Sequence, residues 1–335
     1  MHQVVRAPRR VSRIVIAARL AALIAWMVAA GTAAGCRRDD PGSAPSASAA
    51  QTVPAIAPPP PSAAPPPRAA APAAAATPTT PPTAPIVGQR LISLTPSATE
   101  VVAALGAVGL LVGVDDYSKF PPEIARLPKV GSFLAPNLET IVALRPTLVI
   151  VDDVHGQTAG ALNDAGIATA ACAIHALPDV KAALRTVGTR IGRSGEADRV
   201  IAGIDAALDR AAAARPTRRP RVLAVIDREA GGLGNLVSAG PGSWIDELLA
   251  VVGGENVLAA AGVRYPKIST EEVLRARPDV ILDLSYAARS GIAEWDHLTV
   301  PAVASHRVRA LQDAYLIAPS PRVGEALAAL ARAIR

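Results

Sequence analysis

The sequence NLETIVALRPTLVIV occupies residues 137–151, and the sequence STEEVLRARPDVILD occupies residues 269–283. The two segments align at an offset of 132 residues, with Glu, Arg and Pro at matching places and aliphatic residues toward both ends. Each copy predicts a short helix that ends at the residue before the proline, followed by a buried strand. One such unit in each half of the chain predicts two similar lobes.

Short aliphatic runs alternate with helical patterns from Arg90 onward. Continuous aliphatic runs are typical of parallel strands that are covered on both faces, and the intervening helices favour an α/β architecture. The strands predicted in this way are 91–94, 111–114, 148–151, 168–174, 222–226, 280–284 and 308–311. We therefore predict two α/β lobes with parallel-type sheets.

A long helical pattern separates the two halves. Apolar residues recur at helical spacing through residues 178–214, with Gly192 and Gly195 as points where the helix could break. This predicts a stiff backbone helix between lobe one, at about 88–176, and lobe two, at about 220–335. These three parts form one predicted binding domain over residues 88–335.

The first 87 residues have a different composition. Residues 1–36 combine five Arg and no acidic residue with an uncharged stretch over residues 20–35, which indicates a secretory signal. The stretch ends in Ala33-Ala34-Gly35-Cys36, which is similar to a bacterial lipobox and predicts lipidation of Cys36. Residues 37–87 contain 15 Pro and 16 Ala, which predicts an extended, disordered tether. An ordinary cleaved signal with an incidental cysteine is the alternative.

Charge and cysteine usage exclude several classes of protein. The first 87 residues hold eight of the 34 basic and two of the 28 acidic residues, which leaves 26 of each in 88–335. A nucleic-acid-binding domain needs a basic face, and a neutral domain has no such excess. Two cysteines exclude a disulfide scaffold, and Cys172, in an aliphatic run, is predicted to be a small buried residue.

Aromatic residues are scarce and gather outside the aliphatic strands. Residues 88–335 contain eight, and at least six follow predicted strands or lie in loops rich in Pro and Gly. In open α/β sheets ligands bind beyond the carboxyl ends of the strands, so this distribution predicts a site for a flat or greasy ligand. The alternative is that these rings only close the ends of the lobes.

Two groups of polar residues admit a functional or a structural interpretation. Asp152, Asp153 and His155 follow a predicted strand and could act as acid and base or ligate a metal, but they also fit an ordinary loop with an Asx turn. Glu139 and Glu271 lie at matching places in the first turns of the repeated helices, behind Asn137 and Ser269 as N-caps. They are either complements to the helix dipole or two symmetric acidic contacts for a partner.

The order of several segments resembles the helical-backbone substrate-binding proteins of ABC importers, with the cobalamin-binding branch closest. The resemblance rests on RLISLTPSATE at 90–100, VGVDDYSKFPPE at 112–123 and VGSFLAPNLETIVALRPTLVI at 130–150 in the first half. In the second half it rests on SWIDELLAVVGGENV at 243–257, ISTEEVLRARPDVIL at 268–282 and SPRVGEALAALA at 320–331. It implies two lobes, a ligand cleft and no catalysis.

The resemblance also implies roles for individual residues. Tyr117, Phe133 and Tyr265 match aromatic cleft positions, and Arg228 lies where lobe two lines the cleft. Tyr315 and Arg322 belong to the last cleft segment. The full set expected to contact ligand is Tyr117, Phe133, Asp152, Arg228, Tyr265, Tyr315 and Arg322, and the carboxylates expected to dock on a permease dimer are Glu139 and Glu271.

Asp152 stands where the cobalamin binders carry a Trp, and Phe133 and Tyr265 replace larger Trp residues. These departures reduce the stacking area and favour a different corrinoid or a metal chelate over cobalamin itself. The resemblance implies a cobalamin-like corrinoid, with a ferric siderophore or haem as the alternative. A metal-dependent enzyme using Asp152, Asp153 and His155, and an orphan adaptor, are further alternatives. We expect a monomeric, lipid-anchored protein of the periplasm or cell envelope. It has no catalytic residue, resident metal or cofactor, binds no nucleic acid, and delivers its ligand to an ABC permease dimer with its ATPase.

Overall fold

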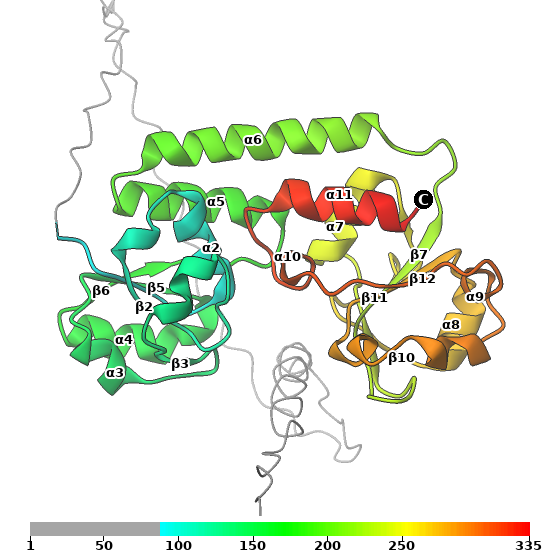
Figure 1. Cartoon of the computed structure of the whole chain (residues 1–335), viewed down its shortest axis with the longest axis horizontal. Coiled ribbons are helices and arrows are strands. Elements are labelled where there is room, and N and C mark those ends of the chain that lie inside the picture. Colours follow the sequence, from blue (N-terminus) through cyan, green and yellow to red (C-terminus); the bar gives the residue numbers. More distant parts are fainter. Residues whose placement is uncertain (1–87) are drawn as a thin grey trace, which may run out of the picture. The chain divides into compact units, whose positions relative to one another are not determined.

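The computed structural model describes residues 88–335. The predicted signal, tether and lipidated Cys36 lie outside the described residues. Within the described part of the chain, no helix combines the length and the apolar character needed to cross a membrane. The elements form two large sheets, each with its own helices, and the chain between the two lobes forms a pair of helices, the longer of which extends along one side of both lobes (Figure 1).

Lobe one contains a four-stranded parallel sheet with the order β2-β1-β5-β6. A two-stranded antiparallel hairpin, β3–β4, stands apart from it. The elements are β1 (Leu91–Ser93), α2 (Pro96–Ala104), β2 (Leu111–Val114), β3 (Gly131–Ser132), β4 (Ala135–Pro136), α3 (Leu138–Ala143), β5 (Leu148–Val151), α4 (Gly156–Asp164) and β6 (Ala168–Ala171).

Lobe two contains a mixed sheet with the order β10-β8-β7-β11-β12, and β9 pairs with β7. β7, β11 and β12 are parallel, whereas β8 is antiparallel to β7. The elements are β7 (Arg221–Asp227), β8 (Leu236–Ser238), α7 (Trp244–Val252), β9 (Glu255–Asn256), β10 (Lys267–Ile268), α8 (Thr270–Ala276), β11 (Val280–Asp283), α9 (Pro301–Ala304), β12 (Val308–Ala310), α10 (Ala314–Ile317) and α11 (Val323–Ala333).

The predicted helix over 178–214 is two helices, α5 (Leu177–Arg190) and α6 (Ser194–Ala213). The chain turns at Gly192, whose φ of +70° is accessible to glycine at little cost. Gly188 then allows close packing of the two helices, because a Cβ there would lie 2.9 Å from the Cβ of Ala197. α6 is the longer backbone helix, and it packs on α5 and on α11 (Figure 1).

One hydrophobic core joins the two lobes. It contains residues of both sheets, such as Leu91 and Val222, together with Leu184 of α5, Ile204 of α6 and Leu327 of α11. Alternate strand residues point away from it, because successive side chains in a strand face opposite sides. These form two smaller clusters, one around Ile92, Val149, Ile141 and Leu162, and the other around Leu223, Ile281, Val273 and Trp295.

The aliphatic runs predicted the central strands because both faces of each sheet are covered. One expectation was wrong, because β6 ends at Ala171 and not at 174. The parallel-type sheets are confirmed, and in lobe two β8 and β10 add antiparallel pairs to the parallel strands.

Candidate functional site

Most of the residues predicted to contact ligand lie just beyond the carboxyl ends of parallel strands. Tyr117 follows β2, Asp152 follows β5, Arg228 follows β7 and Tyr315 follows β12. Phe133 lies between β3 and β4, and Tyr265 precedes β10. The helices that run back along parallel strands place their N-termini at this same edge, so α3 brings Glu139 and α8 brings Glu271 to the carboxyl ends of the two sheets.

A buried carboxylate shapes the loop that carries Tyr117. Asp115 is 1% exposed, and its carboxylate accepts hydrogen bonds from the amide of Tyr117 (2.8 Å) and from the hydroxyl of Ser118. Burial raises the pKa of Asp115 above its ordinary value. Lys129 closes the loop by donating to the backbone oxygens of Asp115 (3.1 Å) and Ser118 (2.9 Å). Tyr117 is half-buried on this fixed loop.

His155 holds the hairpin that carries Phe133. Its Nδ1 accepts from the amide of Asp152 (2.9 Å), so its Nε2 carries the proton and donates to the backbone oxygen of Phe133 (2.6 Å). The two rings also meet edge to face, with centroids 5.3 Å apart. Burial lowers the pKa of His155, which favours the neutral form that this arrangement requires. His155 is therefore a positioning residue, and both of its nitrogens are occupied.

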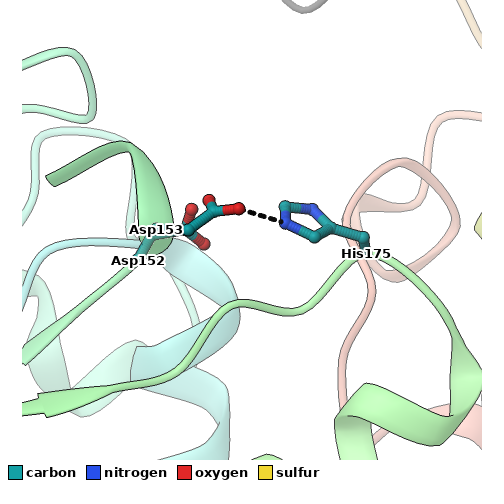
Figure 2. Close-up of side chains that lie close together, drawn as sticks. All are labelled: Asp152, Asp153 and His175. Carbon is teal, nitrogen blue, oxygen red and sulfur yellow. Dashed lines mark hydrogen bonds and ion pairs between the residues drawn. The ribbon is translucent and has the colours of Figure 1, made fainter. Parts of the chain in front are cut away.

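Asp153, the second carboxylate of the loop after β5, pairs with His175 and not with His155. Asp153 accepts from Nε2 of His175 at 3.2 Å, and His175 comes from the segment between β6 and α5 (Figure 2). One oxygen of Asp152 and one of Asp153 lie within 4.8 Å of each other and of a ring nitrogen of His175. Burial and the neighbouring carboxylate raise the pKa of Asp152 to about 7. The grouping of His155 with the two aspartates as an acid, base or metal-ligand set is thus wrong, because His155 faces Phe133.

Arg228 is fully enclosed in lobe two. Its side chain is 0% exposed and forms an ion pair with Asp283 at 2.7 Å. It also donates to the backbone oxygens of Gly232 (2.9 Å) and Gly291 (2.9 Å). The remaining lone pairs of Asp283 accept from Trp295 Nε1 (2.9 Å) and the Ser285 hydroxyl (2.6 Å). The direct ligand contact predicted for Arg228 is corrected to a structural role, because its donors are used inside the lobe.

Arg322 links the two halves of the chain. It donates from Nε and Nη2 to both oxygens of Glu100 in α2, at 2.9 and 2.6 Å. Its guanidinium also lies 4.1 Å from the ring centroid of Phe120 and 4.7 Å from that of Tyr315. These residues adjoin a pocket of about 320 Å³ that is lined by α2, the Phe120-Pro121 turn and Val200 of α6. The predicted contact of Arg322 and Tyr315 with ligand stays a prediction, since Glu100 already holds two of the guanidinium nitrogens.

Tyr265 lies on a loop that lobe two holds by its backbone. The amide of Gly240 donates to the oxygen of Arg264 (2.8 Å), and the amide of Ser238 donates to that of Pro266 (3.0 Å). Gly240 has room for no side chain, since a Cβ there would lie 2.3 Å from the backbone oxygen of Val263. The ring of Tyr265 is half-buried, and burial raises the pKa of its hydroxyl.

Glu139 and Glu271 are exposed in the first turns of α3 and α8. The predicted caps are confirmed: Asn137 accepts from the amide of Thr140 (2.9 Å) and Ser269 from that of Glu272 (3.2 Å). Glu272 also accepts from the Ser269 amide (2.7 Å), which completes the capping box. In lobe two, Glu272 forms the capping box with Ser269, and Glu271 takes no part in it.

Sequence patterns missed four residues of these networks: Glu100, Asp115, His175 and Asp283. Asp115 directly follows a predicted strand, and Asp283 lies near the end of another, so their positions alone indicated the ligand-binding edge of the sheets. Glu100 lies among apolar residues of α2, where a buried carboxylate needs a cationic partner. His175 is 22 residues from Asp153, and no local pattern joins them.

A family model described as "Periplasmic binding protein" matches residues 91–315. The vitamin B12-binding protein of Salmonella choleraesuis (strain SC-B67) is 30% identical over 198 residues, which are 58% of this chain and 71% of that protein. The apo structure of the periplasmic heme-binding protein RhuT from Roseiflexus sp. RS-1 matches with a TM-score of 0.65 and 31% identity, over 74% of this chain and 99% of that one. The vitamin B12-binding protein BtuF of Vibrio cholerae matches with a TM-score of 0.60 and 25% identity, over 73% and 96%.

Proposed function

The chain belongs to the periplasmic binding proteins, which bind substrates for ABC transporters and are not enzymes, and from this premise we propose that it captures a corrinoid outside the cytoplasm. The observation that carries the proposal is the placement of Tyr117 and Tyr315 beyond the carboxyl ends of parallel strands, one in each lobe, with Phe133 and Tyr265 on adjoining loops. Ligands of open α/β sheets bind at this edge. Aromatic faces there suit the large, flat and partly apolar ring of a corrinoid.

The curated relatives support the corrinoid. The Salmonella protein is named for vitamin B12, and the chain covers 71% of its length. The smaller aromatic residues and Asp152 offer less stacking area than three Trp side chains would, which favours a different corrinoid over cobalamin itself.

Haem is the second candidate, because the heme-binding protein RhuT matches 74% of this chain with 31% sequence identity. Corrinoid and haem would use the same aromatic residues in different ways. A corrinoid needs the face of a ring, whereas iron needs a ligand atom such as a tyrosine oxygen.

Calorimetric titration of the purified chain with cobalamin, cobinamide, haem and a panel of small ferric siderophores tests the proposal. Saturable binding of one corrinoid at one site, with a Kd of about 1 μM or lower, supports it. Binding of haem or a siderophore without any corrinoid keeps the transport role and overturns the ligand. If no ligand of the panel gives saturable binding, the result contradicts the proposal and favours an orphan adaptor.

Tyr117→Phe and Tyr117→Ala, with the same pair at Tyr265, separate the two binding modes. Phe keeps the ring and removes the oxygen, so corrinoid affinity is retained in Phe and reduced in Ala. If the tyrosine oxygen ligates haem iron, the Phe variant already loses the absorbance shift that accompanies haem binding.

We further propose that Cys36 is lipidated and that Glu139 and Glu271 contact a permease dimer. Cys36 follows three small residues at the end of an apolar stretch. Each glutamate is exposed and is followed three residues later by an exposed aliphatic side chain, Val142 (47%) or Leu274 (39%). The two lobes thus present matching acidic and apolar contacts. Metabolic labelling with a radioactive fatty acid, which a Cys36→Ser chain would fail to incorporate, tests the anchor.

A further inference from the structure

Asp152, Asp153 and His175 form a cluster of potential metal ligands outside the aromatic residues discussed above (Figure 2). The aspartates directly follow β5, and the histidine lies in the segment between β6 and α5. One ligand atom from each residue lies within 4.8 Å of the others. Two carboxylate oxygens and one imidazole nitrogen at this separation can coordinate a single ion after small side-chain movements.

The two carboxyl groups of the cluster lie side by side and have few partners outside it. Among the described residues, Asp152 and Asp153 form no ion pair with lysine or arginine, and His175 is the sole basic side chain in contact. Asp152 is 8% exposed, and its carboxylate accepts one long hydrogen bond, from the amide of Val154 at 3.5 Å. Buried carboxylates are normally paired or coordinate metals, so this one lacks a usual partner.

The backbone on both sides of the cluster is fixed. The Asp152 amide donates to His155 (2.9 Å), and the amide of Cys172 donates to the oxygen of Val151 (2.7 Å), which ties the two strand ends together. The His175 amide donates to Asp179 of α5 at 3.0 Å. The backbone of the residues that carry the ligand atoms is therefore fixed, so only side-chain rotations are needed to order these atoms around an ion.

We propose that Asp152, Asp153 and His175 bind one divalent transition-metal cation of the Zn²⁺ or Co²⁺ class. Imidazole combined with carboxylate suits Zn²⁺ and its neighbours in the first transition row, whereas Mg²⁺ and Ca²⁺ prefer oxygen ligands alone. The side chains of Asp153 and His175 are 60% and 36% exposed, so an ion has access from solvent. Three protein ligands leave at least one coordination position for water or a donor atom of a bound molecule.

The sequence-based expectation was that no residue of this chain ligates a metal. The proposed site was not visible in the sequence because its histidine, His175, is distant from the aspartates in the chain. It goes beyond the proposed function and does not depend on it. A metal bound here would place a positive charge and an open coordination position at the ligand-binding edge of lobe one.

Titration of the purified, untagged and metal-stripped chain with Zn²⁺ and with Co²⁺ tests the proposal. We expect one ion per chain and, for Co²⁺, the visible absorption of a bound ion with nitrogen and oxygen ligands. Mg²⁺ at the same concentration should give no saturable heat. His175→Ala and Asp153→Asn should each weaken Zn²⁺ binding at least about tenfold.

His297→Ala is the matched control, because His297 is an exposed histidine of lobe two and its loss should leave the Zn²⁺ affinity unchanged. Circular dichroism of each variant separates lost ligands from lost folding. No saturable Zn²⁺ or Co²⁺ binding, or equal affinity in wild type and the folded His175→Ala and Asp153→Asn variants, would overturn the site. Corrinoid titration of the same metal-stripped chain reports on the transport ligand separately.

Discussion

At the scale of single residues, Cys172 is a buried thiol at the end of β6. It is 2% exposed, and burial, with a smaller effect from the charge of Asp152, raises its pKa to about 12. The sequence-based prediction of a small buried residue is confirmed. A thiol in this setting is almost entirely protonated at neutral pH and hence unreactive.

We predict that Cys172 resists alkylation in the native chain. Relative to the ordinary pKa of 9.0, it should hold roughly a thousandth as much thiolate at pH 8. The measurement is labelling of a Cys36→Ser chain with a chromogenic thiol reagent, with and without denaturant. One rapid equivalent appears only in denaturant; prompt labelling of native protein would mean that the β6 end opens easily.

The buried ion pair of Arg228 and Asp283 leads to a second prediction, which concerns the stability of lobe two. Both side chains are 0% exposed, so removing one leaves a charge without a partner inside lobe two. Arg228→Met should lower the free energy of unfolding by about 3–5 kcal/mol, as measured by urea denaturation. Arg210→Met is the control, because Arg210 is exposed in α6 and forms no ion pair with the described residues. This substitution should change the free energy of unfolding by less than about 0.5 kcal/mol.

A double variant separates the cost of leaving the Asp283 charge buried without a partner from the cost of losing hydrogen bonds. Adding Asp283→Leu to Arg228→Met removes the orphaned charge but also the acceptor of Trp295. Partial recovery of stability is expected, because the remaining cost is a hydrogen bond rather than a buried ion. If the single Arg228→Met variant is as stable as wild type, the pair contributes nothing net.

At the scale of elements, the repeated unit has the same backbone turn in both lobes. Arg145 has a φ of +46° and Arg277 a φ of +45°. Each lies within two residues of the end of its helix and directly before a proline. The helix ends are also capped alike, since Arg90 donates to the oxygen of Leu144 (2.8 Å) and Arg221 to that of Ala276 (2.9 Å). The sequence repeat therefore corresponds to a repeated helix end, and arginine occupies a conformation that favours glycine.

We predict that Arg277→Gly raises the free energy of unfolding by up to about 1 kcal/mol, because relief of the left-handed strain exceeds the added entropy of the unfolded chain. Arg277→Val should lower it by about 1–2 kcal/mol, since a β-branched side chain suffers most there. Thermal or urea unfolding provides the values.

The matched control is Arg275→Gly, two residues earlier and inside α8. Glycine there should cost about 1 kcal/mol, the opposite sign from the same substitution at Arg277. Equal effects of glycine at both positions would contradict the strain argument.

The sequence predicted those elements whose signal is local. Strands such as β5 and β11 are aliphatic because both faces of each sheet are covered, and the caps at Asn137 and Ser269 need only neighbouring residues. β8, β9 and β10 are two or three residues long and depend on pairing with distant strands, so no periodicity reveals them. Likewise, Arg322 meets Glu100 across 222 residues, and only the fold brings them together.

At the scale of the whole described domain, the two lobes are joined by apolar and polar contacts. The shared core runs through α5, α6 and α11, and Arg322 and Glu100 tie the start of α11 to α2. The amide of Leu177 at the start of α5 also donates to Glu247 of α7 at 2.6 Å. Changes in the relative position of the lobes would disturb this core, which favours modest closure around a ligand over wide opening.

Limited movement makes Glu139 and Glu271 suitable as a pair, because a partner with two-fold symmetry needs both at a constant separation. We predict that Glu139→Arg together with Glu271→Arg abolishes ABC-dependent uptake and leaves ligand affinity within about twofold. Exposed charges at an interface affect association with the partner, whereas they lie outside the proposed aromatic ligand contacts. Uptake of labelled ligand by cells and calorimetric titration of the purified chain measure the two effects.

Asp164→Arg with Glu255→Arg is the control, because it reverses one exposed acidic residue in each lobe outside the repeated helices. That variant should transport normally, since its net charge changes by the same amount and its N-terminal helix turns are intact. Each single reversal of Glu139 or Glu271 should reduce uptake less than the double. If ligand affinity falls together with uptake in the double variant, the two carboxylates act on the ligand site, and the assignment of a permease contact is wrong.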